Sequence, residues 1–285
     1  MASDESQQPG EGAGVSVPLP LDKLCFTHSQ EGQPIVLVST GSFNPPTILH
    51  LRMFELARDD LTADGYSVLG GYMSPVNDAY GKKGLLPAHH RIAMCRLAAA
   101  DSDLLMVDPW EALQADFQRS IKVLKRIQQG VNAARPEGMP PVRLMLVCGA
   151  DLLESFSRPG VWIEAQLREI FADHGVVCIS RGGSDARRHI HENDLLFEYR
   201  KSIRIVDEWA SNEVSSTLVR RFLSRGLSVK YLTPDSVIQY VKEHKLYTPS
   251  HSKPMDENGA GLSSRTSTKD NAVERKAEAA LILTP

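Results

Sequence analysis

The sequence lacks any long apolar run, and this absence limits the classes of protein to which it can belong. No uninterrupted apolar stretch reaches the roughly 18 residues that a membrane-spanning helix needs. The N-terminal segment carries Asp4 and Glu5 and has no apolar core, so we expect no secretory signal. These absences predict a soluble, intracellular protein that has no membrane partner.

The chain also has few cysteines and a small net charge. The chain of 285 residues has four cysteines, which form no CxxC pair, and no histidine stands at zinc-finger spacing from them. We interpret them as free thiols in a reducing compartment, the cytoplasm or the nucleus, and no basic import cluster decides between these two. A formal net charge of -3 argues against nucleic acid as a partner, although a local basic pocket stays possible.

Low-complexity segments flank a central domain. Residues 1–20 are rich in Gly, Pro, Ser and acidic residues, and cannot bury enough apolar surface to become ordered. From Thr248 onward the chain is again rich in Ser, Lys, Glu and Asn. We therefore expect a disordered tail over 1–20, a single folded domain over 21–247 and a mostly disordered tail over 248–285.

Within the domain, short β-branched runs alternate with stretches of helical periodicity. Strands are expected at 35–38, 68–73, 105–107, 143–148, 175–180 and 203–206. Helices are expected at 47–58, 91–100, 112–129, 216–224 and 234–244. This alternation predicts an α/β fold, a Rossmann-like doubly wound parallel sheet.

The end of the first strand is the strongest chemical signal. Gly41 allows a ligand to approach the backbone, and Thr47 is a plausible helix N-cap that puts His50 in the first helical turn. The helix dipole disfavours a charged imidazole there, so we expect a neutral His50 that can donate to an anion. Since neither GxxxxGK[ST] nor a helix-opening GxGxxG is present, the residues alone predict an anion site, with an ordinary surface histidine as the alternative.

Six blocks along the domain resemble one family. They are 41–47 followed by His50, then 74–85, 108–111, 148–162, 179–181 and 212–220. In this order they resemble eukaryotic nicotinamide/nicotinic acid mononucleotide adenylyltransferases, which belong to the nucleotidyltransferase superfamily. Departures are mild: Gly81 stands where many relatives carry a lysine, and Glu213-Val214 where the family often has Asp and Ile.

The resemblance implies an enzyme of NAD biosynthesis. It would transfer the adenylyl group of ATP to nicotinamide or nicotinic acid mononucleotide and release pyrophosphate. Mg²⁺ would enter with ATP on phosphate oxygens, because the sequence shows no carboxylate cluster and no HExxH motif, and we assign no residue to a metal. Homo-oligomers are possible, since relatives assemble, and the preference between the amidated and the acid substrate stays open.

The same resemblance, read together with the residue chemistry, assigns site residues. The catalytic residues would be His50 and Arg220. ATP would contact His50, Lys83, Ser215, Ser216, Thr217, Leu218, Val219 and Arg220. The mononucleotide or NAD would contact Ser39, Gly41, Ser42, Phe43, Tyr80, Lys82, Trp110, Leu113, Gly149, Asp151, Val161, Trp162, Arg181 and Asn212.

Each assignment has a physical reason and a plainer alternative. The run Ser215 to Thr217 would cap a helix whose amides and hydroxyls face phosphates, with Arg220 in its first turn; the alternative pairs Arg220 with Glu213. The two tryptophans would stack on the nicotinamide ring, or belong to the core.

Asp151 would accept from ribose hydroxyls, or cap a helix. The lysine pair would bind phosphates, one lysine on the mononucleotide and the other on ATP, or be a solvated turn. We assign Lys82 to the mononucleotide and Lys83 to ATP, although the sequence leaves this order open. For the whole chain, the alternatives are a related nucleotidyltransferase with another acceptor, or a nucleotide-binding chaperone-like protein without turnover.

Overall fold

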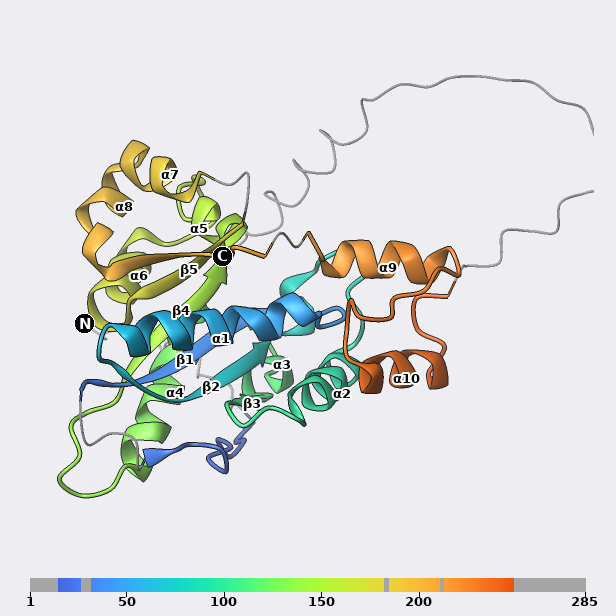
Figure 1. The fold of residues 1–285 in the computed structure, drawn as a ribbon, viewed down its shortest axis with the longest axis horizontal. Coiled ribbons are helices and arrows are strands. Elements are labelled where there is room, and N and C mark those ends of the chain that lie inside the picture. The colour runs from blue at the N-terminus through green and yellow to red at the C-terminus, as the bar shows by residue number, and fades with distance from the viewer. Residues whose placement is uncertain (1–14, 27–31, 182–184, 211–212, 249–285) are drawn as a thin grey trace, which may run out of the picture.

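A parallel sheet of six strands forms the centre of the molecule (Figure 1). The computed structural model describes residues 15–26, 32–181, 185–210 and 213–248. The strand order of the sheet is β3-β2-β1-β4-β5-β6, and every neighbouring pair is parallel. The strands are β1 (Pro34–Gly41), β2 (Ser67–Pro75), β3 (Leu105–Val107), β4 (Arg143–Gly149), β5 (Val176–Ser180) and β6 (Ile203–Asp207).

Alternate residues of the central strands face two separate cores. Ile35 and Leu37 of β1 lie in one core, whereas Val36 and Val38 lie in the other, and all four are fully buried. A strand that is buried on both faces needs an apolar side chain at every position, which is why this segment reads as a continuous β-branched run.

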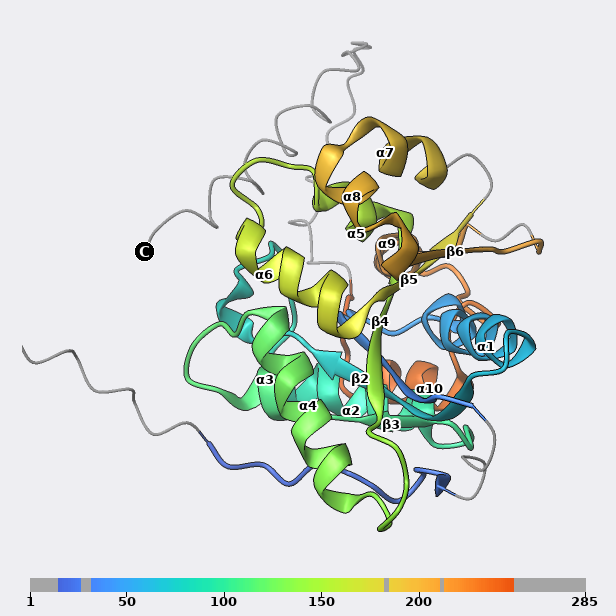
Figure 2. The same cartoon turned by 90° about the vertical axis from the view of Figure 1, so that its left-hand side faces the viewer.

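Helices cover both faces of the sheet. The core that contains Ile35 and Leu37 packs against α1 (Ile48–Ala63) and α2 (Ala88–Ala99). The core that contains Val36 and Val38 packs against α4 (Ser120–Ala134), α5 (Ala150–Ser155) and α6 (Glu164–Glu169). Figure 2 shows α4 and α6 on one side of the strands and α1 on the other. The predicted doubly wound α/β fold is therefore confirmed.

Shorter elements complete the domain. They are the 3-10 turns η2 (Asp78–Tyr80) and η4 (Arg200–Ser202), the π-helical turn η3 (Ile170–His174), and the helices α3 (Trp110–Leu113), α7 (Ala186–Glu192), α8 (Asp194–Glu198), α9 (Ser216–Ser224) and α10 (Asp235–Glu243). In the described part of the chain, no helix has the length and apolar character to cross a membrane.

The expected helix over 112–129 is wrong. Helix α3 ends at Leu113 and α4 begins at Ser120. Between them Gln114 is extended, because its side-chain amide donates to the carbonyl oxygens of Trp110 and Val15 while Asn77 donates to its own carbonyl. These contacts override the local helical periodicity. Helices α5 to α8 were not predicted.

The end of the expected N-terminal tail packs against the domain. The Tyr72 hydroxyl donates to the carbonyl of Pro20 at 2.6 Å, and Arg126 donates to that of Val17. Leu19 packs over Gly130 of α4, where a side chain would collide with it. These contacts of Val17, Leu19 and Pro20 lie before the expected domain start at residue 21. Residues 1–14 and 249–285 lie outside the described residues.

Candidate active site

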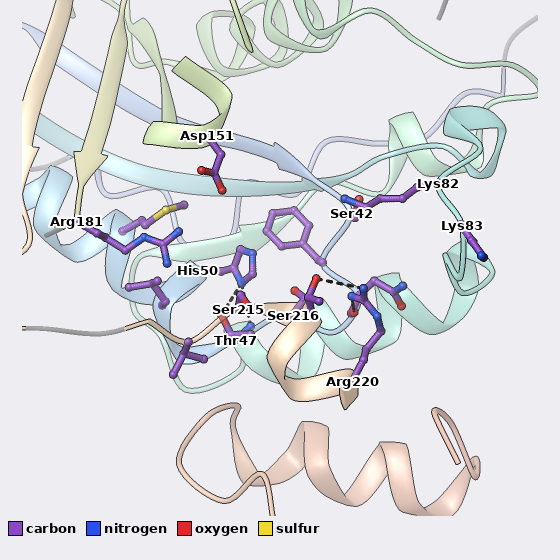
Figure 3. Close-up of a pocket in the computed structure, with 16 residues that line it drawn as sticks. Ser42, Thr47, His50, Lys82, Lys83, Asp151, Arg181, Ser215, Ser216 and Arg220 are labelled. Carbon is purple, nitrogen blue, oxygen red and sulfur yellow. Dashed lines mark hydrogen bonds between the residues drawn. The ribbon is translucent and has the colours of Figure 1, made fainter. Parts of the chain in front are cut away.

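A cavity of about 290 Å³ opens at the carboxyl end of the sheet (Figure 3). The strand order reverses between β1 and β4, and open α/β sheets bind ligands at that point. The residues that line the cavity are Ser42, Phe43, Asn44, Thr47, Leu49, His50, Met53, Lys82, Lys83, Asp151, Arg181, Val214, Ser215, Ser216, Thr217 and Arg220. The N-termini of two helices, α1 and α9, meet at this cavity.

The start of α1 fixes the tautomer of His50. Thr47 is the N-cap, as the sequence predicts, and its backbone N–H donates to Nδ1 of His50 at 3.0 Å. The Thr47 hydroxyl lies 2.7 Å from the same nitrogen. A backbone N–H can only donate, so Nδ1 must be an unprotonated acceptor. The ring proton of neutral His50 is therefore on Nε2.

The surroundings of His50 keep this ring neutral. Burial, reinforced by the positive charge of Arg181, lowers the pKa of His50 from 6.5 to about 4. The edge of the buried Phe43 ring contacts the imidazole, with centroids 5.2 Å apart. At neutral pH, His50 is a hydrogen-bond donor without a formal charge, as the sequence predicts for the free protein.

The turn between β1 and α1 is held by the C-terminal part of the chain. Pro45 and Pro46 have no N–H, so this turn cannot close on its own backbone bonds. Instead the Ser216 hydroxyl donates to the carbonyl of Pro45 at 2.8 Å and the Thr233 hydroxyl donates to that of Pro46 at 2.7 Å. The Ser216 bond places the start of α9 beside the start of α1, and the Thr233 bond holds the segment before α10 against the same turn.

Ser215 caps α9 as the sequence predicts. Its hydroxyl oxygen accepts from the backbone N–H of Leu218 at 3.2 Å. The first amides of a helix, here those of Ser216 and Thr217, have no acceptor within the helix and suit an anion. The start of α9 therefore offers amides to the cavity, whereas the Ser216 hydroxyl is already bonded to Pro45.

Two of the expected ATP contacts on α9, Leu218 and Val219, do not line the cavity. Val219 is fully buried, and its amide donates to the Ser215 carbonyl at 3.0 Å. Neither its side chain nor its N–H is available to a ligand. Leu218 uses its amide in the cap and is not among the residues that line the cavity.

Arg220 lies in the second turn of α9, not in the first as expected. Its side chain extends to the β1–α1 turn. Its Nη1 donates to the carbonyl of Asn44 at 2.9 Å, and Nη2 donates to the Thr217 hydroxyl at 3.3 Å. These are the partners that the structure gives it, in place of the alternative pairing with Glu213. A guanidinium has five N–H donors, so donors remain for a phosphate.

Both lysines of the second block line the cavity. They follow η2 in a loop in which Gly81 and Gly84 adopt left-handed φ values of 69° and 74°. Figure 3 shows Lys82 pointing toward the cavity and Lys83 pointing away from its centre. We define residues 81–85 as the lysine loop.

Arg91, for which no sequence motif predicts a role, fixes the flank of the lysine loop. It is fully buried and donates to the carbonyls of Leu86 (2.8 Å), Val76 (2.6 Å) and Ser42 (3.2 Å). Its guanidinium also pairs with Asp78 at 2.7 Å. One buried cation thus ties β2, η2 and the β1–α1 turn together. The sequence around Arg91 predicts only an arginine on a helix, so its buried contacts could not be predicted.

Asp151 and Arg181 reach the cavity from β4 and β5. Gly149 ends β4 and is the N-cap of α5, so Asp151 lies in the first turn and is not the cap. Its carboxylate points into the cavity from the side opposite α9 (Figure 3). Arg181 follows β5 directly. Among the described lining residues, Asp151 is the single acidic one, against Lys82, Lys83, Arg181 and Arg220.

The two tryptophans are not among the lining residues. Trp162 donates its indole N–H to the Ser155 hydroxyl at 3.1 Å and packs against the edge of Phe156. Trp110 opens helix α3 instead of lying in a loop, and carries the guanidinium of Arg126 5.2 Å from its ring centroid. Both indoles are partly buried and pack against the core, so their stacking on a ligand stays a prediction.

The remaining predicted contacts that the structure describes lie outside the lining. Ser39 is buried within β1 and Gly41 ends it, whereas Tyr80 and Leu113 are exposed. Asn212 lies outside the described residues. Val161 is half-buried beside Trp162. Five lining residues were not assigned as ligand contacts from the sequence: Asn44, Thr47, Leu49, Met53 and Val214.

Comparisons with known proteins now identify the family. The model of cytidylyltransferase-like proteins matches residues 38–222. A nicotinamide/nicotinic acid mononucleotide adenylyltransferase from Arabidopsis thaliana is 52% identical over 235 residues, which cover 82% of this chain and 99% of that protein. The chain belongs to this adenylyltransferase family. A protein of the same name from Oryza sativa subsp. japonica is 54% identical over 237 residues, covering 82% of this chain and 95% of that protein.

A solved structure supports the fold of this adenylyltransferase. The nicotinic acid mononucleotide adenylyltransferase from Plasmodium falciparum, complexed with NaAD, superimposes with a TM-score of 0.55 and covers 75% of this chain and 98% of that chain. Its sequence is only 16% identical, so this likeness concerns the fold.

Proposed function

We propose that this chain transfers the adenylyl group of ATP to nicotinamide mononucleotide or nicotinic acid mononucleotide, forming NAD or its deamido form and pyrophosphate. The observation that carries this proposal is the meeting of two helix N-termini at one cavity, with His50 on α1 and Arg220 on α9. One nucleotide with several phosphates spans both helix starts.

The start of α9 binds the phosphates that leave. The amides of Ser216 and Thr217 face the β- and γ-phosphates, and the helix dipole adds to the attraction. Arg220 and Lys83 supply full positive charges on the same side. Because negative charge moves onto pyrophosphate as the bond breaks, these contacts strengthen in the transition state.

His50 acts at the α-phosphate. An oxygen of the mononucleotide 5′-phosphate attacks the α-phosphorus of ATP, and the bond to the bridging oxygen of the β-phosphate breaks. A phosphate with a second pKa near 6 is already ionised at neutral pH, so no general base is needed. His50 donates its Nε2–H to a non-bridging oxygen, where charge builds up.

The mononucleotide occupies the other side of the cavity. Lys82 pairs with its phosphate, together with the β1–α1 turn from Gly41 to Phe43, and Asp151 accepts from ribose hydroxyls. The nicotinamide ring stacks on Trp162 and Trp110, whose orientations are set by the Ser155 hydroxyl and by Arg126. The other proposed contacts are Ser39, Tyr80, Leu113, Gly149, Val161, Arg181 and Asn212.

Mg²⁺ is proposed to enter with ATP. Among the described residues, no group of three or more His, Cys, Asp or Glu side chains could hold a metal, and Asp151 is the single carboxylate of the lining. Phosphate oxygens and water would therefore supply the ligands. When bound, the ion neutralises phosphate charge.

The four cysteines are free thiols, and Cys95, Cys148 and Cys178 are buried. This supports a reducing compartment, which we propose to be the cytoplasm or the nucleus.

The test is a product assay with purified protein, ATP, Mg²⁺ and either mononucleotide. We expect NAD or its deamido form together with an equal amount of pyrophosphate. If neither dinucleotide forms, the proposed function is wrong. If another acceptor is adenylylated while both mononucleotides are not, the chain is a related nucleotidyltransferase.

A further inference from the structure

Asn44 hydrogen-bonds to three separate segments, which are the lysine loop, α9 and the C-terminal end of the domain. Its side chain is buried, with 4% of its surface exposed. Its Nδ2 donates to the carbonyl of Gly84 at 2.8 Å, and its own carbonyl accepts from Nη1 of Arg220 at 2.9 Å. Its Oδ1 accepts from the hydroxyl of Tyr247 at 2.6 Å.

The bond to Gly84 ties down the lysine loop. Gly84 directly follows Lys83, and the loop turns at two glycines with left-handed φ values. Loops of exposed residues with such turns have few contacts of their own to hold them. Arg91 fixes the flank of the loop at Leu86, and the Asn44 amide holds the loop next to the lysines.

The bond from Arg220 places the other cation. Since the guanidinium rests on the Asn44 carbonyl, a displacement of this residue moves Arg220 as well. Asn44 thus contacts Arg220 through its backbone carbonyl and the lysine loop through its side chain. Displacement of a binding group by about 1 Å can lower a rate about 100-fold.

Tyr247 fixes the orientation of the Asn44 amide. The Gly84 carbonyl can only accept, so Nδ2 must face it and Oδ1 must face the tyrosine hydroxyl. Lys245 and Tyr247 have positive φ values of 51° and 58°, which are uncommon for residues with side chains. This bent backbone turns the tyrosine back onto the apolar cluster between α2 and α10.

We propose that Asn44 is a positioning residue for adenylyl transfer, and that the Tyr247 hydroxyl holds it in the orientation that joins the lysine loop to Arg220. This inference rests on the proposed function. The C-terminal end of the domain thereby contributes to turnover without lining the cavity.

The chain offers a matched control in Tyr240. Its hydroxyl hydrogen-bonds to Nδ1 of His90 at 2.9 Å, and the residue packs in the same cluster between α2 and α10. Tyr247→Phe and Tyr240→Phe each remove one tyrosine hydroxyl bond from this region. A purely structural role predicts the same consequences for both.

The test compares these variants in the dinucleotide assay and in thermal unfolding. We expect Tyr247→Phe to lower kcat about tenfold, whereas Tyr240→Phe keeps the wild-type kcat at a similar loss of Tm. Asn44→Ala should lower kcat about 100-fold. Adding Tyr247→Phe to Asn44→Ala should change kcat no further, because the tyrosine acts through the asparagine.

Equal kcat values for Tyr247→Phe and Tyr240→Phe would overturn the proposal, as would an independent loss from Tyr247→Phe in the Asn44→Ala background. If Asn44→Ala does not fold, the comparison of the two tyrosine variants still decides. Failure of the wild-type protein to form a dinucleotide would instead count against the proposed function.

Discussion

The backbone N–H of Thr47 donates to Nδ1 of His50 at 3.0 Å, so the helix cap and the proposed phosphate donor use opposite nitrogens of one ring. The cap removes the choice of tautomer. The Nε2–H is then a fixed donor whose orientation is set before any ligand arrives. Preorganised donors of this kind stabilise developing charge more than mobile ones.

Substitution at His50 can separate these two uses of the ring. In His50→Gln, the Oε1 atom can accept from the Thr47 N–H, as glutamine does at this position of a capping box. The glutamine Nε2 amide can still donate, but it lacks the ring that fixes the direction of the donor, so we expect kcat to fall about 100-fold, the effect of a displaced contact. The Tm should stay near the wild-type value.

His50→Ala is the companion variant. It loses the donor and the cap, so kcat should fall roughly 100- to 1,000-fold and at least as far as in the glutamine variant, while Tm also decreases. A buried donor without a partner costs about 1–3 kcal/mol. Wild-type turnover in His50→Ala, measured by dinucleotide formation, would rule out the assigned role.

The low pKa of His50 makes a prediction about stability. Its folded value of about 4 lies below its ordinary value of 6.5, so the unfolded chain binds the proton more readily. The stability contributed by neutral His50 is complete above about pH 6.5 and is lost as the pH falls toward 4. Denaturation measured across this window should show a steeper loss in the wild-type protein than in His50→Gln.

NMR of the ligand-free protein tests the same point directly. The His50 ring should show the Nε2–H tautomer from pH 8 to about pH 5 and titrate with a midpoint near 4. A midpoint near 6.5 would mean that burial and Arg181 do not hold the ring neutral.

Arg220 has a natural control in its neighbour. Arg220 bonds to the Asn44 carbonyl and lines the cavity, whereas Arg221 is exposed on the same helix and is not in the lining. Arg220→Gln should lower kcat/KM for ATP about 100-fold or more. Arg221→Gln should leave it within about twofold, the result expected of an exposed side chain away from the site. Similar losses in both would indicate a general effect of positive charge.

The two lysines of the lysine loop should act on different substrates. Lys82 points into the cavity, so Lys82→Ala should raise KM for the mononucleotide about tenfold, the loss of one charged hydrogen bond. Lys83→Ala should raise KM for ATP by a smaller factor. Initial rates with one substrate saturating and the other varied will measure both constants, and an exchange of these effects would reverse the assignment.

The fold and the two helix starts could be predicted because their signals are local. The buried run of β1, the proline turn and the Thr47 cap lie within a few residues of one another, and Ser215 caps α9 in the same way. The prediction from local spacing was wrong where contacts between residues distant in sequence determine the backbone conformation. Gln114 is held extended by Asn77 and Val15, and this broke the expected helix.

The partners within the site could not be predicted for the same reason. The Tyr247 hydroxyl meets Asn44 across 203 residues of sequence, and Arg220 meets the Asn44 carbonyl across 176. A motif indicates which residue types gather at a site, but the use of each hydrogen-bonding group depends on packing. The Ser216 hydroxyl, expected on phosphate, instead holds Pro45.

The fate of labelled phosphate tests the central claim most directly. The protein is supplied with nicotinamide mononucleotide and with ATP labelled at either the α- or the γ-phosphate, and the products are separated. Adenylyl transfer predicts that α-label appears in NAD and γ-label in pyrophosphate, at equal rates that fall together in His50→Gln. Label from the γ-position in the acceptor, or release of ADP, would contradict attack at the α-phosphorus.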